Sequence, residues 1–321
     1  MTLREEAIIS TGLTKRRVAA LPTLDKAEII QRKRHSRWQR FRIGARCLRA
    51  VRDAAYFRAE RDAFLAGLSF PREIATEGVI LLACNGFYYH SFARGMLLSF
   101  EKVAAPQSVH LHISGADQET IEDVRRLADK FHHLALSLTT DDASIAHSLP
   151  YQSVYFTALR FIVLHGVLTT TGRPVLCLDV DGIARKPLWP TVAAALDGSD
   201  AALIRRDEKQ PWRKVRAGAA AFAPTRQGLN FTDALSRALL ANLSKLPRYH
   251  VDQITLHHVS EAMTRKDGLT VAPLTTSLSS PELDCDPLVW TAQSWRMKNS
   301  EEYQRMLRSI EETVQVPGQD E

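Results

Sequence analysis

Two aspartates separated by one residue follow a short apolar run, and they are the residues in this sequence best suited to chemistry. The run 175–178 has strand character, and Asp179, Asp181 and Gly182 come directly after it. Two carboxylates this close repel each other unless one is protonated or a cation lies between them. Mg²⁺ and Mn²⁺ take oxygen ligands and also bind diphosphate oxygens. Asp179 and Asp181 are therefore candidate metal ligands, and the alternative is a turn in which both cap neighbouring amides.

The elements around this pair alternate between strand patterns and helix patterns. Apolar or alternating runs predict strands at 79–84, 109–113, 134–138, 175–178, 201–204 and 218–223, and helical stripes predict helices at 92–100, 121–131, 154–168, 231–243 and after Asp252. This alternation predicts an α/β fold with a largely parallel sheet. Ligands of such sheets bind outside the carboxyl ends of the strands, where Asp179 and Asp181 would lie.

The first 72 residues are basic, whereas the rest of the chain is slightly acidic. Residues 1–72 hold 17 basic and 7 acidic side chains, and the remainder holds 25 and 29. Between Trp38 and Ala55, apolar residues recur at helical spacing among arginines, which predicts one or two basic amphipathic helices. We expect a helical arm packed on the main domain, with a peripheral membrane or an acidic protein as the alternative contact. The basic and aromatic interleaving typical of nucleic-acid binding is not visible, so no nucleic acid is expected.

Composition narrows the class of protein further. The four cysteines are widely spread without a CxxC pair, which favours reduced thiols over a zinc site or disulfides. Charges interrupt the apolar runs, so we expect no membrane-spanning helix, and the N-terminal residues lack an export-signal pattern. The expected location is the cytoplasm, with peripheral membrane contact through the arm. His110 and His112 share one face of a predicted strand, and we interpret them as edge or solvated histidines.

With its surroundings, the segment LDVDG resembles the DxD motif of the GT-A glycosyltransferases, the nucleotide-diphospho-sugar transferases. Four features occur in the order of that family, and together they span residues 78–298. They are VILLACNGFYYHSFARGMLLSF as first strand, nucleotide loop and helix; YFTALRFIVLHGVL with Arg160; RAGAAAFAPT with Gly218; and Asp252-Gln253 followed by Leu256. The resemblance implies a GT-A-like, Rossmann-type mixed sheet flanked by helices, with an N-terminal helical extension.

The resemblance also implies roles for single residues. Asp181 would be a direct metal ligand, and Asp179 would hold the metal and contact ribose or the donor sugar. Arg160, on the helix before the DxD strand, would add a fixed positive charge, with a helix-surface arginine as the alternative. The remaining roles are nucleotide binding by Ala83, Asn85 and Tyr88, closure over the donor sugar by Gly218, catalysis or sugar binding by Asp252 and Gln253, and phosphate binding by Lys298.

Several of these positions have an ordinary structural alternative or depart from the family pattern. Tyr88 would stack on the base, or be a half-buried tyrosine, and Asp252 would be a general base or a helix N-cap. Asn85 stands where many relatives have Asp, which leaves the base open. One family group has a histidine six residues before the lysine, and Ala292 stands there. The candidate substitutes for that third metal ligand are His250 and His257.

The sequence thus predicts a metal-dependent, hexosyltransferase-type enzyme that uses Mn²⁺ or Mg²⁺. It would move a sugar from a UDP- or GDP-linked donor to a hydroxyl of a glycan, lipid or protein, for example in surface glycan synthesis. The expected parts are the arm (1–72), a catalytic domain (73–300) and a C-terminal helix with a polar tail (301–321). One alternative is a haloacid dehalogenase-like phosphatase using Asp179 and Asp181, and another is a non-catalytic nucleotide-sugar-binding scaffold. The phosphatase fits less well, because about 100 residues of α/β pattern precede the aspartates.

Overall fold

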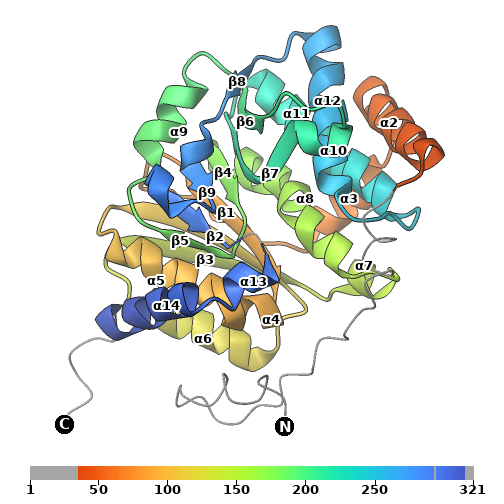
Figure 1. The fold of residues 1–321 in the computed structure, drawn as a ribbon. Helices are drawn as coiled ribbons and strands as arrows, with labels where there is room; N and C mark the ends of the chain where they lie inside the picture. Colours follow the sequence, from red (N-terminus) through yellow and green to blue (C-terminus); the bar gives the residue numbers. More distant parts are fainter. Residues whose placement is uncertain (1–34, 293, 315–321) are drawn as a thin grey trace. The chain divides into compact units, whose positions relative to one another are not determined.

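The computed structural model describes residues 35–292 and 294–314, and its fold is mixed α/β. The part of the predicted arm before residue 35 lies outside the described residues. The central sheet has the strand order β3-β2-β1-β4-β7-β6-β8 (Figure 1). Its strands are β1 (Val79–Asn85), β2 (Gln107–Ser114), β3 (Leu134–Asp141), β4 (Val175–Leu178), β6 (Ala201–Arg205), β7 (Val215–Phe222) and β8 (Val271–Pro273).

The sheet is mostly parallel, and this brings several strand ends to one edge. Strand β1 pairs in parallel with β2 and β4, β2 with β3, and β6 with β8, whereas β7 is antiparallel to β4 and β6. The carboxyl ends of β1 to β4 therefore lie at the same edge. The amide of Asp179 donates to the carbonyl oxygen of Gly218 at 3.0 Å, which extends the β4–β7 pairing by one residue.

Helices cover both faces of this sheet. Val79 and Leu81 of β1 belong to one apolar core, and Ile80 and Leu82 to the other, because successive side chains of a strand point to opposite faces. One face carries α2 (Arg37–Arg52), α3 (Arg58–Ala66), α7 (Ser144–His147), α8 (Ser153–Thr171), α11 (Arg226–Leu243) and α12 (Val251–Asp267). The other carries α4 (Gly86–Tyr88), the π-helix η2 (Tyr89–Ala93), α5 (Arg94–Lys102), α6 (Gln118–Ala128), α9 (Trp189–Leu196) and α14 (Glu301–Val314).

A small second sheet ties the C-terminal part of the chain to the strand end of β4. Strand β5 (Gly182–Ala184) directly follows Asp181, and β10 (Val289–Thr291) lies between it and β9 (Ser279–Ser280). The amide of Ala292 donates to the carbonyl oxygen of Asp181 at 3.0 Å. Residues after β10 are thereby held beside the two aspartates. The short helices are α10 (Pro211–Lys214), η3 (Thr276–Leu278), η4 (Leu283–Cys285) and α13 (Trp295–Lys298).

The predicted strands and helices are present, and most extend a few residues beyond the predicted bounds. The patterns missed β8 and the small sheet, whose strands have two or three residues each and offer little periodicity. The expectation of no membrane-length helix was wrong, because α8 is long and apolar enough by length and composition. Its apolar character reflects a place in the core, since 67% of that window is buried.

The interpretation of His110 and His112 as edge or solvated histidines was also wrong, because both are fully buried and β2 lies between β3 and β1 in the sheet. They form a chain of hydrogen-bonded side chains between β2 and β3. His110 lies 2.9 Å from Ser137 Oγ and 3.0 Å from Thr139 Oγ1, and His112 lies 2.8 Å from Thr139 Oγ1 and 2.8 Å from Asp141 Oδ2. Burial, and then the neighbouring His112, lower the pKa of His110 to about 3, so it is neutral. We call these five residues the histidine chain.

Candidate active site

Asp179 lies at the carboxyl end of β4, between an arginine and a glycine. Its Oδ1 lies 2.8 Å from Nη1 of Arg160, and 38% of its side chain is exposed. A Cβ placed on Gly218 would meet Asp179 Oδ2 at 2.9 Å, which is closer than real Cβ contacts allow. Gly218 is therefore the residue that leaves room for this carboxylate. The sequence assigned the glycine to the donor sugar, and the structure places it directly against the aspartate.

Asp181 is more enclosed than Asp179 and is only partly satisfied. Its Oδ2 lies 2.7 Å from Nζ of Lys298, whereas its Oδ1 is shielded from solvent without a hydrogen-bond partner in the described chain. Burial first, and then repulsion by Asp179, raise the pKa of Asp181 to about 6, although Lys298 opposes the shift. Burial alone would lower the pKa of Lys298, but the Asp181 carboxylate raises it above its usual value. The site thus holds a carboxylate with one unused oxygen.

Arg160 lies between Asp179 and Asp252. Asp252 is on α12, whereas Arg160 is on α8. Arg160, on α8, is 4% exposed; its Nη2 donates to the carbonyl oxygen of Ala217 at 2.8 Å and lies 3.9 Å from Asp252 Oδ2. Burial raises the pKa of Asp252 to about 6, and Arg160 opposes the shift. The helix-surface alternative for Arg160 is therefore wrong.

The N-cap alternative for Asp252 is wrong as well. Asp252 lies in the first turn of α12, and the N-cap of that helix is His250. His250 has a φ of 66°, a left-handed conformation that typically costs about 1–3 kcal/mol in a residue other than glycine. Such strain persists only where the surrounding structure enforces it, and here it sets the start of the helix that carries Asp252.

Lys298 and Tyr88 meet on the Asp181 side of the site. The ammonium of Lys298 lies 5.1 Å from the ring centre of Tyr88 and 4.8 Å from that of Phe92. Burial raises the pKa of Tyr88, so its hydroxyl stays protonated. Tyr88 therefore lies next to Lys298, the candidate for phosphate binding. The sequence did not indicate that these two residues would be neighbours.

The other predicted nucleotide and sugar contacts surround this group. Asn85 ends β1, and its Oδ1 accepts from the amide of Tyr88 at 2.9 Å, which caps α4. Ala83 lies two residues earlier on β1 and is buried, so its backbone is what it can offer a ligand. Gln253 follows Asp252 on the first turn of α12. The structure thus brings Asp179, Asp181, Arg160, Asp252, Gly218, Lys298 and Tyr88 together, with Ala83, Asn85 and Gln253 on the adjoining strand and helix.

Two tyrosines near the site were missed by sequence reasoning. Burial, and then the nearby Tyr88 and Asp252, raise the pKa of Tyr249 to about 12. The hydroxyl of Tyr303, on α14, lies 3.4 Å from the carbonyl oxygen of Asp181. The place of Tyr249 three residues before Asp252 was an available signal. The sequence held no comparable signal for Tyr303, because this residue reaches the site through the pairing of β10 with β5.

A cation fits this site only in part. The orphaned Asp181 Oδ1 and the carboxylate of Asp179 are oxygen donors of the kind that Mg²⁺ and Mn²⁺ prefer. Within residues 35–292 and 294–314, no group of three or more His, Cys, Asp or Glu side chains is arranged to hold a metal ion. His257 faces His258, Glu261 and Lys214 rather than the aspartates, and Ala292 offers no side-chain ligand. The donor set suits a cation whose other ligands come from a bound diphosphate and water.

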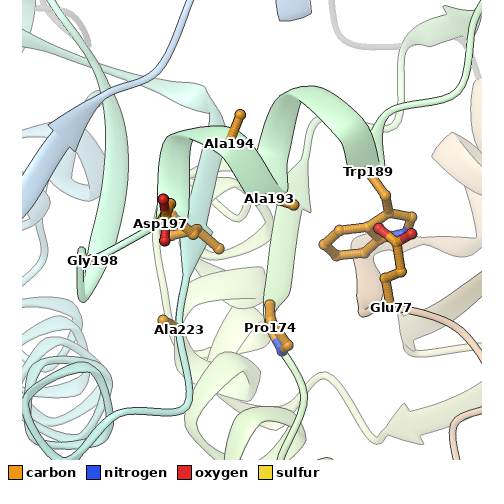
Figure 2. A pocket seen from close by; sticks show the side chains of 9 residues that line it. Glu77, Pro174, Trp189, Ala193, Ala194, Asp197, Gly198 and Ala223 are labelled. Carbon is orange, nitrogen blue, oxygen red and sulfur yellow. The ribbon is translucent and has the colours of Figure 1, made fainter.

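A separate shallow pocket of about 470 Å³ lies at the opposite edge of the sheet (Figure 2). Glu77 and Pro174, which line it, precede β1 and β4, so the pocket is at the amino ends of these strands. Trp189, Asp197 and Ala223 complete much of its wall. The pocket and the group of charged side chains therefore lie at opposite edges of the sheet. We place the candidate active site at the carboxyl edge, because the charged and partly satisfied side chains are there.

The fold is that of the GT-A glycosyltransferases, as comparison with solved structures shows. The galactosyltransferase LgtC, in complex with donor and acceptor sugar analogues, matches with a TM-score of 0.55 and 12% identity over 75% of this chain and 98% of LgtC. An active-site mutant of LgtC matches over the same shares with a TM-score of 0.52 and 12% identity. No family model and no curated protein matches the sequence. The predicted fold class is confirmed, and the likeness extends over nearly the whole of LgtC.

Proposed function

We propose that this chain is a glycosyltransferase that moves a sugar from a nucleoside-diphosphate donor, UDP- or GDP-linked, to a hydroxyl acceptor with the help of a divalent cation. The observation that carries the proposal is the Asp181 carboxylate at the carboxyl edge of the sheet. One of its oxygens pairs with Lys298, and the other is buried without a partner in the described chain. The GT-A fold supports the proposal, because this edge is where open α/β sheets bind ligands.

The proposed reaction breaks the bond between the sugar and the diphosphate, so negative charge develops on the leaving group. Lys298 and Arg160 are two buried cations within reach of this place, and such fixed charges stabilise developing charge more than water does. Lys298 would contact the diphosphate, and Arg160 would hold Asp179 against the donor. Asp252 is ionised above a pH of about 6 and can accept a hydrogen bond or a proton from a sugar hydroxyl.

Asp179 and Asp181 would hold the cation, which supplies Lewis-acid stabilisation of the diphosphate when bound. Because the described chain offers two carboxylates and no third ligand of that kind, the diphosphate would complete the coordination. We therefore expect Mn²⁺ to bind weakly alone and at least about tenfold more tightly with UDP or GDP, as each opposite charge added to the site favours the ion.

The test is a calorimetric and thermal-shift screen of UDP- and GDP-sugars against the wild-type chain, with and without Mn²⁺. A donor at a hundred times its Kd should raise the unfolding free energy by about 2.7 kcal/mol. Asp181→Asn should abolish the cation-dependent part of the shift. The matched control is Asp197→Asn, which removes a carboxylate from the pocket at the other edge.

Three outcomes would count against the proposal. The first is that no nucleotide sugar binds. The second is that Asp181→Asn and wild type bind donors identically with and without Mn²⁺. The third is that a donor binds, but no sugar is released or transferred in the presence of water, glycans or lipid acceptors, which would favour the non-catalytic scaffold. Release of phosphate from sugar phosphates, abolished by Asp179→Asn, would favour the phosphatase instead.

A further inference from the structure

Helix α2 carries an apolar strip on its outer face, away from the core. Trp38, Phe41, Ala45 and Leu48 follow one another at steps of three, four and three residues, which places them on one side of a helix. Trp38 is 60% exposed, Phe41 64% and Leu48 39%. The inner face of the same helix buries Ile43, Cys47 and Ala50 against the core that α11 and α12 share. The residues of the outer strip are therefore different from those that pack the helix onto the core.

The two rings of the strip are already arranged side by side. Trp38 and Phe41 stack with ring centres 5.4 Å apart, and the guanidinium of Arg42 lies 5.1 Å from the ring centre of Trp38. Single exposed apolar residues are common on protein surfaces, but a stacked aromatic pair continued by Ala45 one helical turn further and by Leu48 at the next turn is a contiguous patch.

The charged residues of helix α2 itself all have one sign. Helix α2 contains six arginines and no acidic residue: Arg37, Arg40, Arg42, Arg46, Arg49 and Arg52. Arg37, Arg42, Arg49 and Arg52 are exposed like the strip itself. The first acid after the helix is Asp53, whose carboxylate lies 3.8 Å from Arg49. The outer face of α2 is thus apolar along its middle and cationic along its sides.

The loop between α11 and α12 lies next to the start of α2 and carries a further exposed apolar residue. The amide of Arg248 donates to Nε2 of His35 at 3.0 Å, so the loop is fixed next to the helix N-terminus. Leu246 in this loop is 59% exposed, and Lys245 beside it is exposed too. Among the side chains whose burial the structure describes, the exposed large hydrophobic ones are Trp38, Phe41, Leu48 and Leu246, and they belong to α2 and this loop.

We propose that this surface, formed by the outer face of α2 and the 245–248 loop, binds an anionic lipid membrane. Helices that lie in a membrane interface combine Trp, Phe and Leu on one face with arginines that contact headgroups, as α2 does. Nucleic acid or an acidic protein segment would use the arginines but would leave the strip of Trp38, Phe41 and Leu48 in water. The apolar strip therefore favours a lipid surface over a polar polyanion.

The experiment measures sedimentation of the full chain with vesicles of phosphatidylcholine, with and without phosphatidylglycerol. The wild type should bind the vesicles that contain phosphatidylglycerol and bind pure phosphatidylcholine weakly. Trp38→Ser with Phe41→Ser should weaken binding at least about tenfold, because each large apolar side chain gains that much or more from burial. Arg42→Gln with Arg49→Gln should weaken it several-fold and reduce its salt dependence.

The matched control is Arg305→Gln with Arg308→Gln. Both arginines are exposed on α14, so these substitutions remove the same amount of charge from another helix. The control should bind as wild type does, and all variants should unfold at the same temperature, since the changed side chains are exposed. As an independent measurement, brominated lipid should quench wild-type tryptophan fluorescence, and Trp38→Phe should lose most of that quenching while still binding.

The proposal is overturned if the wild type ignores phosphatidylglycerol vesicles. It is also overturned if the Trp38 and Phe41 variant binds as tightly as wild type while the Arg42 and Arg49 variant does not. That second result would show a surface for a soluble polyanion, with nucleic acid or an acidic protein as the partner.

Discussion

Two partly buried aspartates at the carboxyl edge of the same sheet have opposite surroundings. Asp141, which ends the histidine chain, has both oxygens fully engaged: Oδ1 accepts from Ser114 Oγ at 2.7 Å and the amide of Ala143 at 2.6 Å, and Oδ2 lies 2.8 Å from His112 and 3.0 Å from Tyr155. Asp181 pairs with Lys298 through one oxygen, and its other oxygen has no partner in the described chain.

The pKa values follow this difference. Burial would raise the pKa of Asp141, but the hydrogen bonds from His112 and Ser114 outweigh it and lower the value. Burial raises the pKa of Asp181 to about 6 and Asp179 adds to the shift. A buried polar group that is satisfied stabilises a fold, whereas one kept unsatisfied costs stability and marks a place for a ligand. The comparison predicts opposite effects for the same isosteric change at the two aspartates.

The largest effect on folding should come from Asp141→Asn. The new amide nitrogen would face donors that now point at a carboxylate, so we expect a loss of about 2–4 kcal/mol in unfolding free energy. Urea unfolding of the full chain measures it. Nucleotide-sugar binding per folded molecule should stay near that of wild type, and a specific loss of binding without destabilisation would place Asp141 in the site instead.

Gly218→Ala should have the next largest effect, because its Cβ would approach Asp179 Oδ2 to 2.9 Å. Moving the carboxylate or the strand should cost about 1–3 kcal/mol, the usual range for overpacking. We expect weaker cation-dependent donor binding in the same variant, measured by calorimetry. Ala219→Ser, one residue along β7 and buried in the other direction, is the control for a change in that strand alone.

Asp181→Asn should change stability in the opposite direction from Asp141→Asn. Because the ionised carboxylate is penalised by burial and by Asp179, its removal should raise the unfolding free energy of the cation-free protein by about 1 kcal/mol. Unfolding in EDTA measures this gain. If Asp181→Asn instead lowers the unfolding free energy by more than about 1 kcal/mol, the ion pair between Asp181 and Lys298 stabilises the fold, and Asp181 is not a residue kept unsatisfied for a ligand.

The smallest effect concerns pH, and it separates the two aspartates again. The folded pKa of Asp181 is raised, so its penalty is fully present above a pH of about 6 and disappears towards pH 4; the gain from Asp181→Asn should shrink over that window. The folded pKa of Asp141 is lowered, so its contribution persists above pH 4 and is lost as pH falls through the folded value. The cost of Asp141→Asn should therefore stay constant between pH 6 and pH 4.

Local pattern was enough to predict the main strands, whereas the placement of Arg160 and Asp252 in one site with Asp179 was implied by the resemblance to the GT-A glycosyltransferases. The β4 run, the α8 stripe and the start of α12 are each readable alone, and the fold then fixes their relative places. The burial of His110 and His112 was not readable, because it depends on α3 and the 67–72 segment covering β2, where Phe64 and Phe70 lie against the two rings. Tyr303 and the β5–β10 pairing depend on contacts between distant parts of the chain, for which periodicity gives no signal.

The pairing of β10 with β5 has a consequence for when the site is made during synthesis. Lys298 and Tyr303 reach Asp181 only after β10 has joined β5, whereas β1 to β7 and the helices between them are complete earlier in the chain. A nascent chain that does not yet include β10 and the residues after it would have the sheet edge with Asp179 and Asp181 but not Lys298. We expect the emerging polypeptide to acquire its competence abruptly, once the segment from β10 to Tyr303 has been translated and has docked.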